Sequence, residues 1–139
     1  MPGRLLTGRG GGRGRGRRRR VMSFLKPCLL FMLHQGEAHG YSLLDGLDEF
    51  GFNPERLDPS LVYRALRDME ENGWVVSRWG EESQGPQRRV YQISPEGEER
   101  LDEWIEDLRK TRQEIDRLLV AYERDVQSEN QYERKVNDA

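Results

Sequence analysis

The stretch from Asp58 to Gly73 constrains the fold most, because its residues separate onto two faces of one helix. Its apolar residues follow the i, i+3, i+4, i+7 spacing of a buried stripe, formed by Val62, Ala65, Leu66 and Met69. Asp58 suits the cap position, Pro59 the first helical position and Gly73 the helix exit. The stretch therefore predicts a helix that packs on a core along one side only.

The other face of this helix carries hydroxyl, phenol and guanidinium groups, from Ser60, Tyr63, Arg64 and Arg67. Side chains of these types reach the phosphates and base edges of nucleic acids. We therefore expect these four residues to be DNA-binding residues.

Two further helices are predicted before this stretch. Phe24 to Gln35 is apolar almost all round, which is typical of a central helix. Residues 36–40 contain two glycines and break that helix, and Tyr41 to Phe50 has the apolar spacing of a second one. The connection at 51–57 contains Asn53-Pro54, a turn signal.

A β-hairpin is predicted after the stretch. Residues 74–79 are rich in β formers, residues 80–87 are a polar turn region, and residues 88–93 alternate like a second strand. Arg88 and Arg89 lie at the base or tip of this hairpin, where they either contact DNA phosphate or remain on a solvated surface. The order of elements predicts a mainly α fold with a small β-hairpin, a winged helix-turn-helix domain over residues 22–94.

Ser94-Pro95 predicts the start of a long helix over residues 95–126. Its seam positions are spaced alternately by three and four, as in a coiled coil, with the polar Thr111 filling one slot among the apolar Leu101, Trp104, Leu108, Ile115, Leu118 and Tyr122. Such a stripe is too long to be covered by a small hairpin, so the helix is expected to form a homodimer. Residues 127–139 are a polar tail that we expect to fray.

The first 21 residues are rich in glycine and arginine and are expected to be disordered. Two interpretations remain open: a basic arm that extends the contact with DNA, or a segment upstream of a native start at Met22. Residues 1–20 hold eight of the 23 basic residues and no acidic residue, so the rest carries 15 basic against 25 acidic residues. Positive charge for DNA must therefore be concentrated locally.

Several classes of function are disfavoured by the sequence. There is no paired general acid and base, no nucleophile with its base and no phosphate-binding glycine loop, so no enzyme and no cofactor are expected. His34, His39 and Cys28 have no spacing suited to zinc, and Cys28 fits an apolar core. The lone cysteine and the lack of a membrane-length apolar run favour the reducing cytoplasm.

Several segments resemble the PadR-like family of transcriptional regulators in the same order. Residues 25–30 resemble its first helix, and Gly36-Glu37-Ala38-His39-Gly40-Tyr41 resembles its Gly-x-x-His-Gly-Tyr junction. Residues 62–75 resemble its Leu-Tyr-x-x-Leu-x-x-Leu-Glu-x-x-Gly-Leu-Val helix. Residues 79–85 and 88–97 resemble its wing and the entry to its last helix. The resemblance covers about residues 22–122.

This resemblance implies a dimeric repressor of operator DNA that pairs through its C-terminal helix and contacts DNA through Tyr63, its neighbours and basic wing residues. It also implies release by a small aromatic ligand bound at a tryptophan of the last helix. Trp104 is a candidate for that role, with a dimer-core aromatic as the alternative. A winged-helix module that binds proteins instead of operator DNA is the alternative function, favoured by the acidic balance outside the arm.

Overall fold

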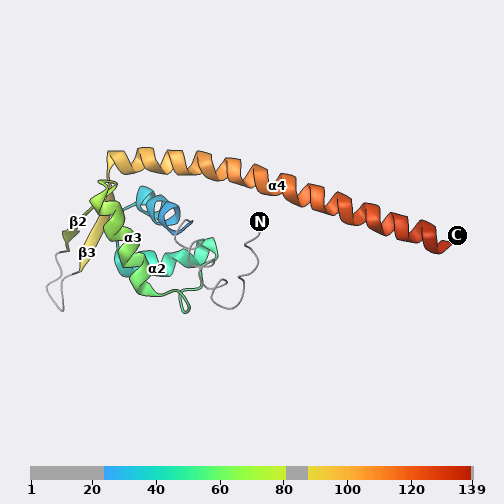
Figure 1. Cartoon of the computed structure of the whole chain (residues 1–139). Helices are drawn as coiled ribbons and strands as arrows, with labels where there is room; N and C mark the ends of the chain where they lie inside the picture. The colour runs from blue at the N-terminus through green and yellow to red at the C-terminus, as the bar shows by residue number, and fades with distance from the viewer. Residues whose placement is uncertain (1–23, 81–87, 139) are drawn as a thin grey trace. The chain divides into compact units, whose positions relative to one another are not determined.

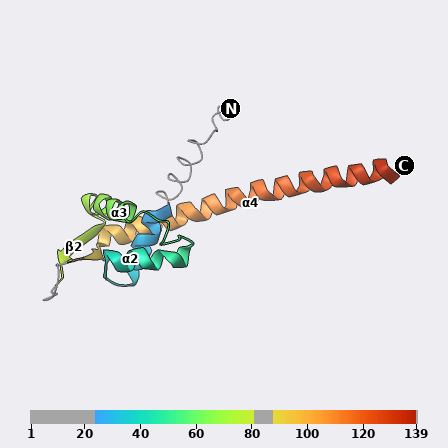
Figure 2. The same ribbon diagram turned by 90° about the horizontal axis from the view of Figure 1, so that it is seen from below.

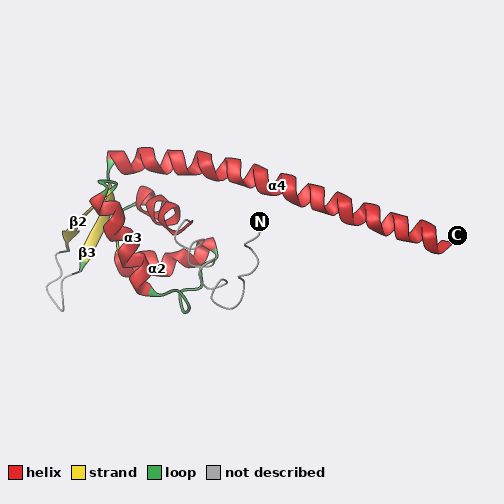
Figure 3. Cartoon of the chain, viewed as in Figure 1, coloured by secondary structure: helices red, strands yellow, loops and turns green. Residues whose placement is uncertain are grey.

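The computed structural model describes residues 24–80 and 88–138. The predicted arm at 1–21 and the turn at 81–87 lie outside the described residues. The chain divides into two compact units, one that ends at Asp102 and one that begins at Glu103. Helices predominate, beside one small antiparallel sheet (Figure 3). The predicted winged helix-turn-helix fold with a long C-terminal helix is confirmed.

The helical part of the first unit contains helix 24–35, α2 (Gly40–Gly46), the 3₁₀ helix η3 (Leu47–Phe50) and α3 (Pro59–Glu71) (Figure 1). Figure 2 shows α2 and α3 from below. The second helix was predicted as one element, but its last turn is 3₁₀. Gly46 weakens the α-helix there, and Gly51, with a φ of 90°, ends the turn in the left-handed region.

Helix α3 begins and ends as its sequence predicts. The backbone N–H of Ser60 donates to Oδ1 of Asp58 at 3.0 Å, so Asp58 caps the helix ahead of Pro59. At the other end Gly73 has a φ of 79°, and its N–H donates to the carbonyl of Glu70 at 3.0 Å. The N–H of Trp74 donates to the carbonyl of Met69 at 2.9 Å, which completes a Schellman motif.

The sheet has three strands in the order β1-β3-β2, all antiparallel: β1 (Ala38–His39), β2 (Val75–Trp79) and β3 (Arg89–Ile93). The hairpin of β2 and β3 is the predicted one. Strand β1 was not predicted, because two residues are too few to show a period and pairing with β3 alone defines them.

The core of the first unit is made by apolar side chains from every helix and from the sheet. The largest of the fully buried ones are Leu25, Leu29, Leu30, Leu33, Leu43, Leu47, Val62, Leu66, Met69 and Val75. Cys28 is also buried, which raises the pKa of its thiol to about 11. The prediction of a small buried hydrophobe at this position is confirmed.

Helix α4 (Pro95–Asp138) begins at a capped end. The hydroxyl of Ser94 accepts from the N–H of Gly97 at 3.0 Å and donates to the carbonyl of Gly73 at 2.6 Å, which joins the helix start to the exit of α3. The helix continues to Asp138, well past the predicted end at 126, because no Gly or Pro follows Gly97. Among the helices within 24–80 and 88–138, none combines the length and apolarity needed to cross a bilayer.

Gly97 lies where the first turn of α4 meets Trp74, the residue before β2. A Cβ at this position would lie 2.1 Å from the carbonyl oxygen of Trp74 and 2.7 Å from Cγ1 of Ile93. We expect Gly97→Ala to lower the free energy of unfolding by more than about 2 kcal/mol, because backbone must move. Gly36→Ala is the matched control: nothing lies within 4 Å of its Cβ, and a change below about 0.5 kcal/mol is expected. Urea unfolding at equal protein concentration measures both, and equal effects would contradict the prediction.

Candidate nucleic-acid interface

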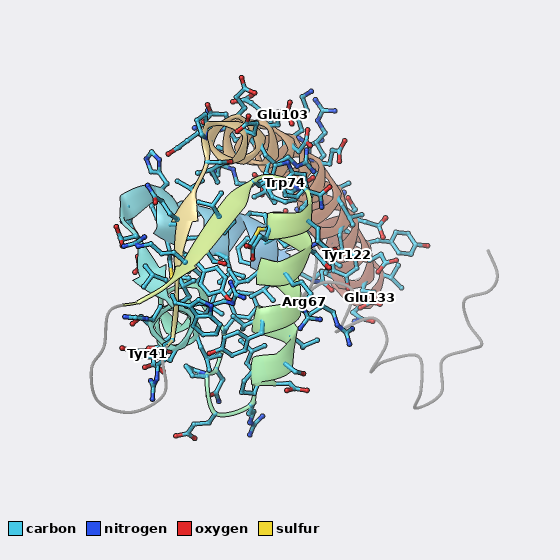
Figure 4. The ribbon with its side chains drawn as sticks, turned by 90° about the vertical axis from the view of Figure 1, so that its left-hand side faces the viewer. Tyr41, Arg67, Trp74, Glu103, Tyr122 and Glu133 are labelled. Atoms are coloured by element: carbon cyan, nitrogen blue, oxygen red, sulfur yellow. The ribbon has the colours of Figure 1, made fainter. Side chains whose placement is uncertain are left out.

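The exposed face of α3 carries the four predicted contact residues. Ser60, Tyr63, Arg64 and Arg67 are all exposed, whereas the side chains of Val62, Ala65, Leu66 and Met69 are fully buried. The predicted division of the helix into two faces is confirmed. In Figure 4 Arg67 extends from α3, while Tyr41 lies near the loop ends of the strands.

Tyr63 is held against the first residue of α2. A Cβ at Gly40 would lie 2.5 Å from Cε1 of Tyr63 and 3.1 Å from its hydroxyl oxygen. The ring therefore occupies the space that any side chain at Gly40 would need. This close approach of α2 and α3 restricts the directions that the Tyr63 ring can take.

The two wing arginines both lie on aromatic rings. Cζ of Arg88 is 4.8 Å from the ring centroid of Tyr41, and Cζ of Arg89 is 4.6 Å from that of Trp79. The ring of His39 stacks on Tyr41, with 5.1 Å between the two ring centroids. Cation–π contact restrains a guanidinium without neutralising it, and both arginines remain exposed. They lie at the loop end of the hairpin rather than at its base.

A hollow of about 340 Å³ is lined by residues of both α3 and the wing. It is lined by Gly40, Tyr41, Tyr63, Trp79, Arg88, Arg89 and Tyr91. Of the predicted contact residues, Tyr63, Arg88 and Arg89 share this hollow, and Ser60, Arg64 and Arg67 lie outside its lining. None of the lining residues that the structure describes is acidic, and two of them are arginines, although the chain outside the arm is acidic.

Sequence reasoning missed four lining residues: Gly40, Tyr41, Trp79 and Tyr91. A signal for two of them existed, because Trp79, Arg89 and Tyr91 fall on one face of the hairpin once the strands alternate and pair. Gly40 and Tyr41 carried no such signal, since their place depends on how α2 packs against α3.

The phenol of Tyr91 lies on the floor of the hollow, with its side chain 7% exposed. Burial raises its pKa, and Glu70 and Tyr63 act in the same direction; Arg89 and Arg67 oppose the shift. The shift favours the neutral phenol, which carries an O–H donor.

Two ion pairs neutralise acidic side chains elsewhere in the first unit. Nζ of Lys26 lies 3.5 Å from Oδ2 of Asp68, and Arg78 pairs with Glu37 on the opposite face of the hairpin. Within the described ranges, no group of three or more His, Cys, Asp and Glu side chains could hold a metal ion.

The predicted dimerisation residues differ in exposure. Leu101 is 5% exposed and belongs to the core of the first unit, which leaves it little surface for a partner. In the second unit Ile115, Leu118 and Tyr122 are 51%, 69% and 65% exposed, and Leu119 and Val120 add to the exposed apolar surface of the helix. Trp104 and Leu108 are partly exposed.

Comparisons with known proteins place these features in a family. Residues 29–103 match the family model described as the transcriptional regulator PadR-like family. A PadR-like transcriptional regulator from Bacillus cereus is similar at 26% identity and a TM-score of 0.62, over 73% of this chain and 96% of that one. A Streptococcus transcriptional regulator is similar at 28% identity and a TM-score of 0.60, over 69% and 92%.

A third similar structure is Bacillus subtilis PadR in complex with operator DNA, at 23% identity and a TM-score of 0.52. The match covers 59% of this chain and 46% of that protein, and at this identity it shows the fold alone. Among curated proteins no match was found.

The raised pKa of Tyr91 gives a testable pH dependence. In an alkaline titration followed by phenolate absorbance, we expect Tyr91→Phe to remove the phase that titrates at the highest pH. Because the folded-state pKa lies above the unfolded value, this tyrosine's contribution to stability is full below the unfolded pKa and is lost as pH rises through the folded one. Stability of the wild type should therefore fall more steeply at alkaline pH than that of Tyr91→Phe. Identical titrations would contradict the prediction.

Proposed function

Because the chain belongs to the PadR-like family of transcriptional regulators, we propose that it is a sequence-specific repressor that binds operator DNA. One observation carries the proposal: Tyr63 of α3 shares a hollow with Arg88 and Arg89 of the wing, and the lining described within 24–80 and 88–138 contains no acidic residue. A winged helix-turn-helix domain contacts DNA through its recognition helix and its wing, and this hollow joins the two. The solved structure of B. subtilis PadR, which has a similar fold, is a complex with operator DNA, and this supports DNA as the partner proposed here.

Each side chain has a proposed role in DNA binding. Arg64 and Arg67 contact phosphate or guanine in the major groove, where a guanidinium donates to guanine O6 and N7. Ser60 and Tyr63 donate to phosphate, and Arg88 and Arg89 contact the backbone beside the groove. Helix α3 is the recognition helix in this arrangement.

The proposal includes a homodimer formed through α4. Exposed apolar side chains at Ile115, Leu118 and Tyr122 repeat with the spacing of a coiled-coil seam, and a second copy of the chain provides a matching surface. A two-fold dimer presents two recognition helices to successive major grooves, roughly 34 Å apart, so the operator should be near-palindromic.

A small aromatic effector is part of the proposal through the family, with Trp104 as the candidate platform. The alternative role for Trp104 is an aromatic of the dimer core, which we favour because it stands on the same seam as Leu108. The proposed location is the cytoplasm, where a reducing environment suits the single buried cysteine. The proposed function is regulatory and involves no catalysis.

A protein-interaction module is the second candidate, because 25 acidic residues outnumber the 15 basic ones beyond residue 20. Selection of bound DNA from a random pool, with protein starting at Met1 and at Met22, separates the two functions. A repressor enriches a near-palindromic site and loses affinity with salt, whereas the interaction module enriches none. The two starting points also show whether the basic arm contributes.

We expect Arg64→Ala to weaken binding to the selected duplex without unfolding the protein. The loss should be about 1–3 kcal/mol if Arg64 reads a guanine, or a salt slope reduced by about one if it binds phosphate. Arg109→Ala is the matched control, because it removes the same charge from an exposed side chain that pairs only with Glu106 at 3.3 Å. Gel-shift titration at several salt concentrations measures both variants, and unchanged affinity of Arg64→Ala would rule out its role.

We expect Leu118→Glu to dissociate the homodimer, because a carboxylate on the seam would be buried without a partner. Gln113→Glu adds the same charge to α4 away from the seam and should leave the dimer intact. Sedimentation equilibrium measures the mass of each variant. A dimeric Leu118→Glu would show that the interface lies elsewhere.

A further inference from the structure

A chain of two hydrogen bonds links the recognition helix to the wing. The hydroxyl of Ser77 donates to Oε2 of Glu70 at 2.8 Å, and Nη1 of Arg89 donates to the hydroxyl of Ser77 at 2.8 Å. The chain thus runs from the last turn of α3 through β2 to the first residue of β3.

The register of the hairpin explains how these groups meet. Trp79 stands opposite Arg89, and Ser77 stands opposite Tyr91, so all four share one face of the two strands. Arg89 can therefore lie on the ring of Trp79 and reach the diagonal neighbour Ser77 at the same time. Its guanidinium is held by two contacts of different kinds, although the residue is exposed.

The donor and acceptor roles of the Ser77 hydroxyl are fixed by its two hydrogen bonds. A hydroxyl has one hydrogen and two lone pairs. Because its hydrogen is given to the carboxylate of Glu70, a lone pair is left for the guanidinium of Arg89. A carboxylate at one end and a guanidinium at the other make both bonds charge-assisted, which strengthens them relative to neutral ones.

The place of Glu70 has no explanation in the stability of its own helix. It lies in the last turn of α3, where the helix dipole disfavours an acidic side chain, and no basic residue is present in that turn. An acid is also unfavourable close to a surface that binds a polyanion. The contact with Ser77 is the visible reason for a carboxylate at this position.

We infer that Glu70 and Ser77 are positioning residues that hold the guanidinium of Arg89 ready for DNA phosphate. This inference rests on the proposed function, in which Arg89 contacts the DNA backbone. A long side chain that is already held in the free protein loses less rotamer freedom when it binds. The wing and the recognition helix are then presented to DNA as one pre-ordered surface.

The first test needs no DNA. In the full-length wild type, NMR of the arginine side-chain N–H groups should show restricted rotation for Arg89. Ser77→Thr keeps a hydroxyl and should preserve that restriction, whereas Ser77→Ala should abolish it. A freely rotating Arg89 in the wild type would overturn the inference.

The second test measures affinity for a fluorescently labelled duplex of about 30 base pairs, three turns of B-DNA, that carries the site selected from the random pool. Ser77→Ala and Glu70→Ala should each bind about three- to tenfold more weakly, because the arginine must be ordered on binding. Removal of a negative charge would by itself strengthen binding to a polyanion. Weaker binding of Glu70→Ala is therefore the opposite of what the charge change alone predicts. Ser77→Thr should bind like the wild type.

Variants in an Arg89→Ala background separate positioning from folding. There Ser77→Ala should have no further effect on affinity, since the side chain that it positions is gone. Equal losses with and without Arg89 would show that Ser77 acts through the fold, and would overturn the inference. Wild-type protein that fails to bind the duplex overturns the proposed function; wild-type protein that binds while Ser77→Ala binds equally well overturns this inference alone.

Discussion

Burial of the apolar stripe of α3 is the constraint on which the rest of the first unit depends. Val62, Leu66 and Met69 lose all contact with solvent. At about 25 cal/mol per Å² of apolar surface, burial of each such side chain stabilises the fold by roughly 1.5–3 kcal/mol. Because this stripe faces the core, the residues at the intervening positions must face solvent. The polar surface of α3 is therefore a consequence of the packing of its other side.

The ends of α3 extend this constraint to the neighbouring elements. The Schellman motif at Gly73 reverses the chain directly into β2, so the wing starts at a fixed place beside the helix. Ser94 then bonds to the carbonyl of Gly73 and caps α4 through its second contact, and the absence of a Cβ at Gly97 lets these segments meet. One junction thus sets the relative positions of the recognition helix, the wing and the first turn of α4.

The positive charge proposed for DNA binding comes from where a few arginines lie and not from the net charge of the chain. The chain has a net charge of −2 with the arm included. Arg88 and Arg89 nevertheless line a hollow whose described lining contains no acidic side chain, and both guanidinium groups lie on aromatic rings that do not neutralise them. Three acidic side chains of the first unit have partners of their own: Asp68 pairs with Lys26, Glu37 pairs with Arg78, and Glu70 accepts from Ser77. An acidic protein can in this way present a surface suited to a polyanion.

The sequence by itself determined the type and order of the elements, the two faces of α3 and the caps at Asp58, Gly73 and Ser94. These features follow from local spacing and backbone preference, which act within a few residues. Tertiary structure alone decided the two-residue strand β1, the burial of Leu101 and the meeting of Tyr63 with Gly40. It also placed Arg88 on Tyr41 and linked Glu70 to Arg89 through Ser77. Each of these features joins residues that are distant in the chain, and their contact depends on how helices and strands pack, which no local pattern contains.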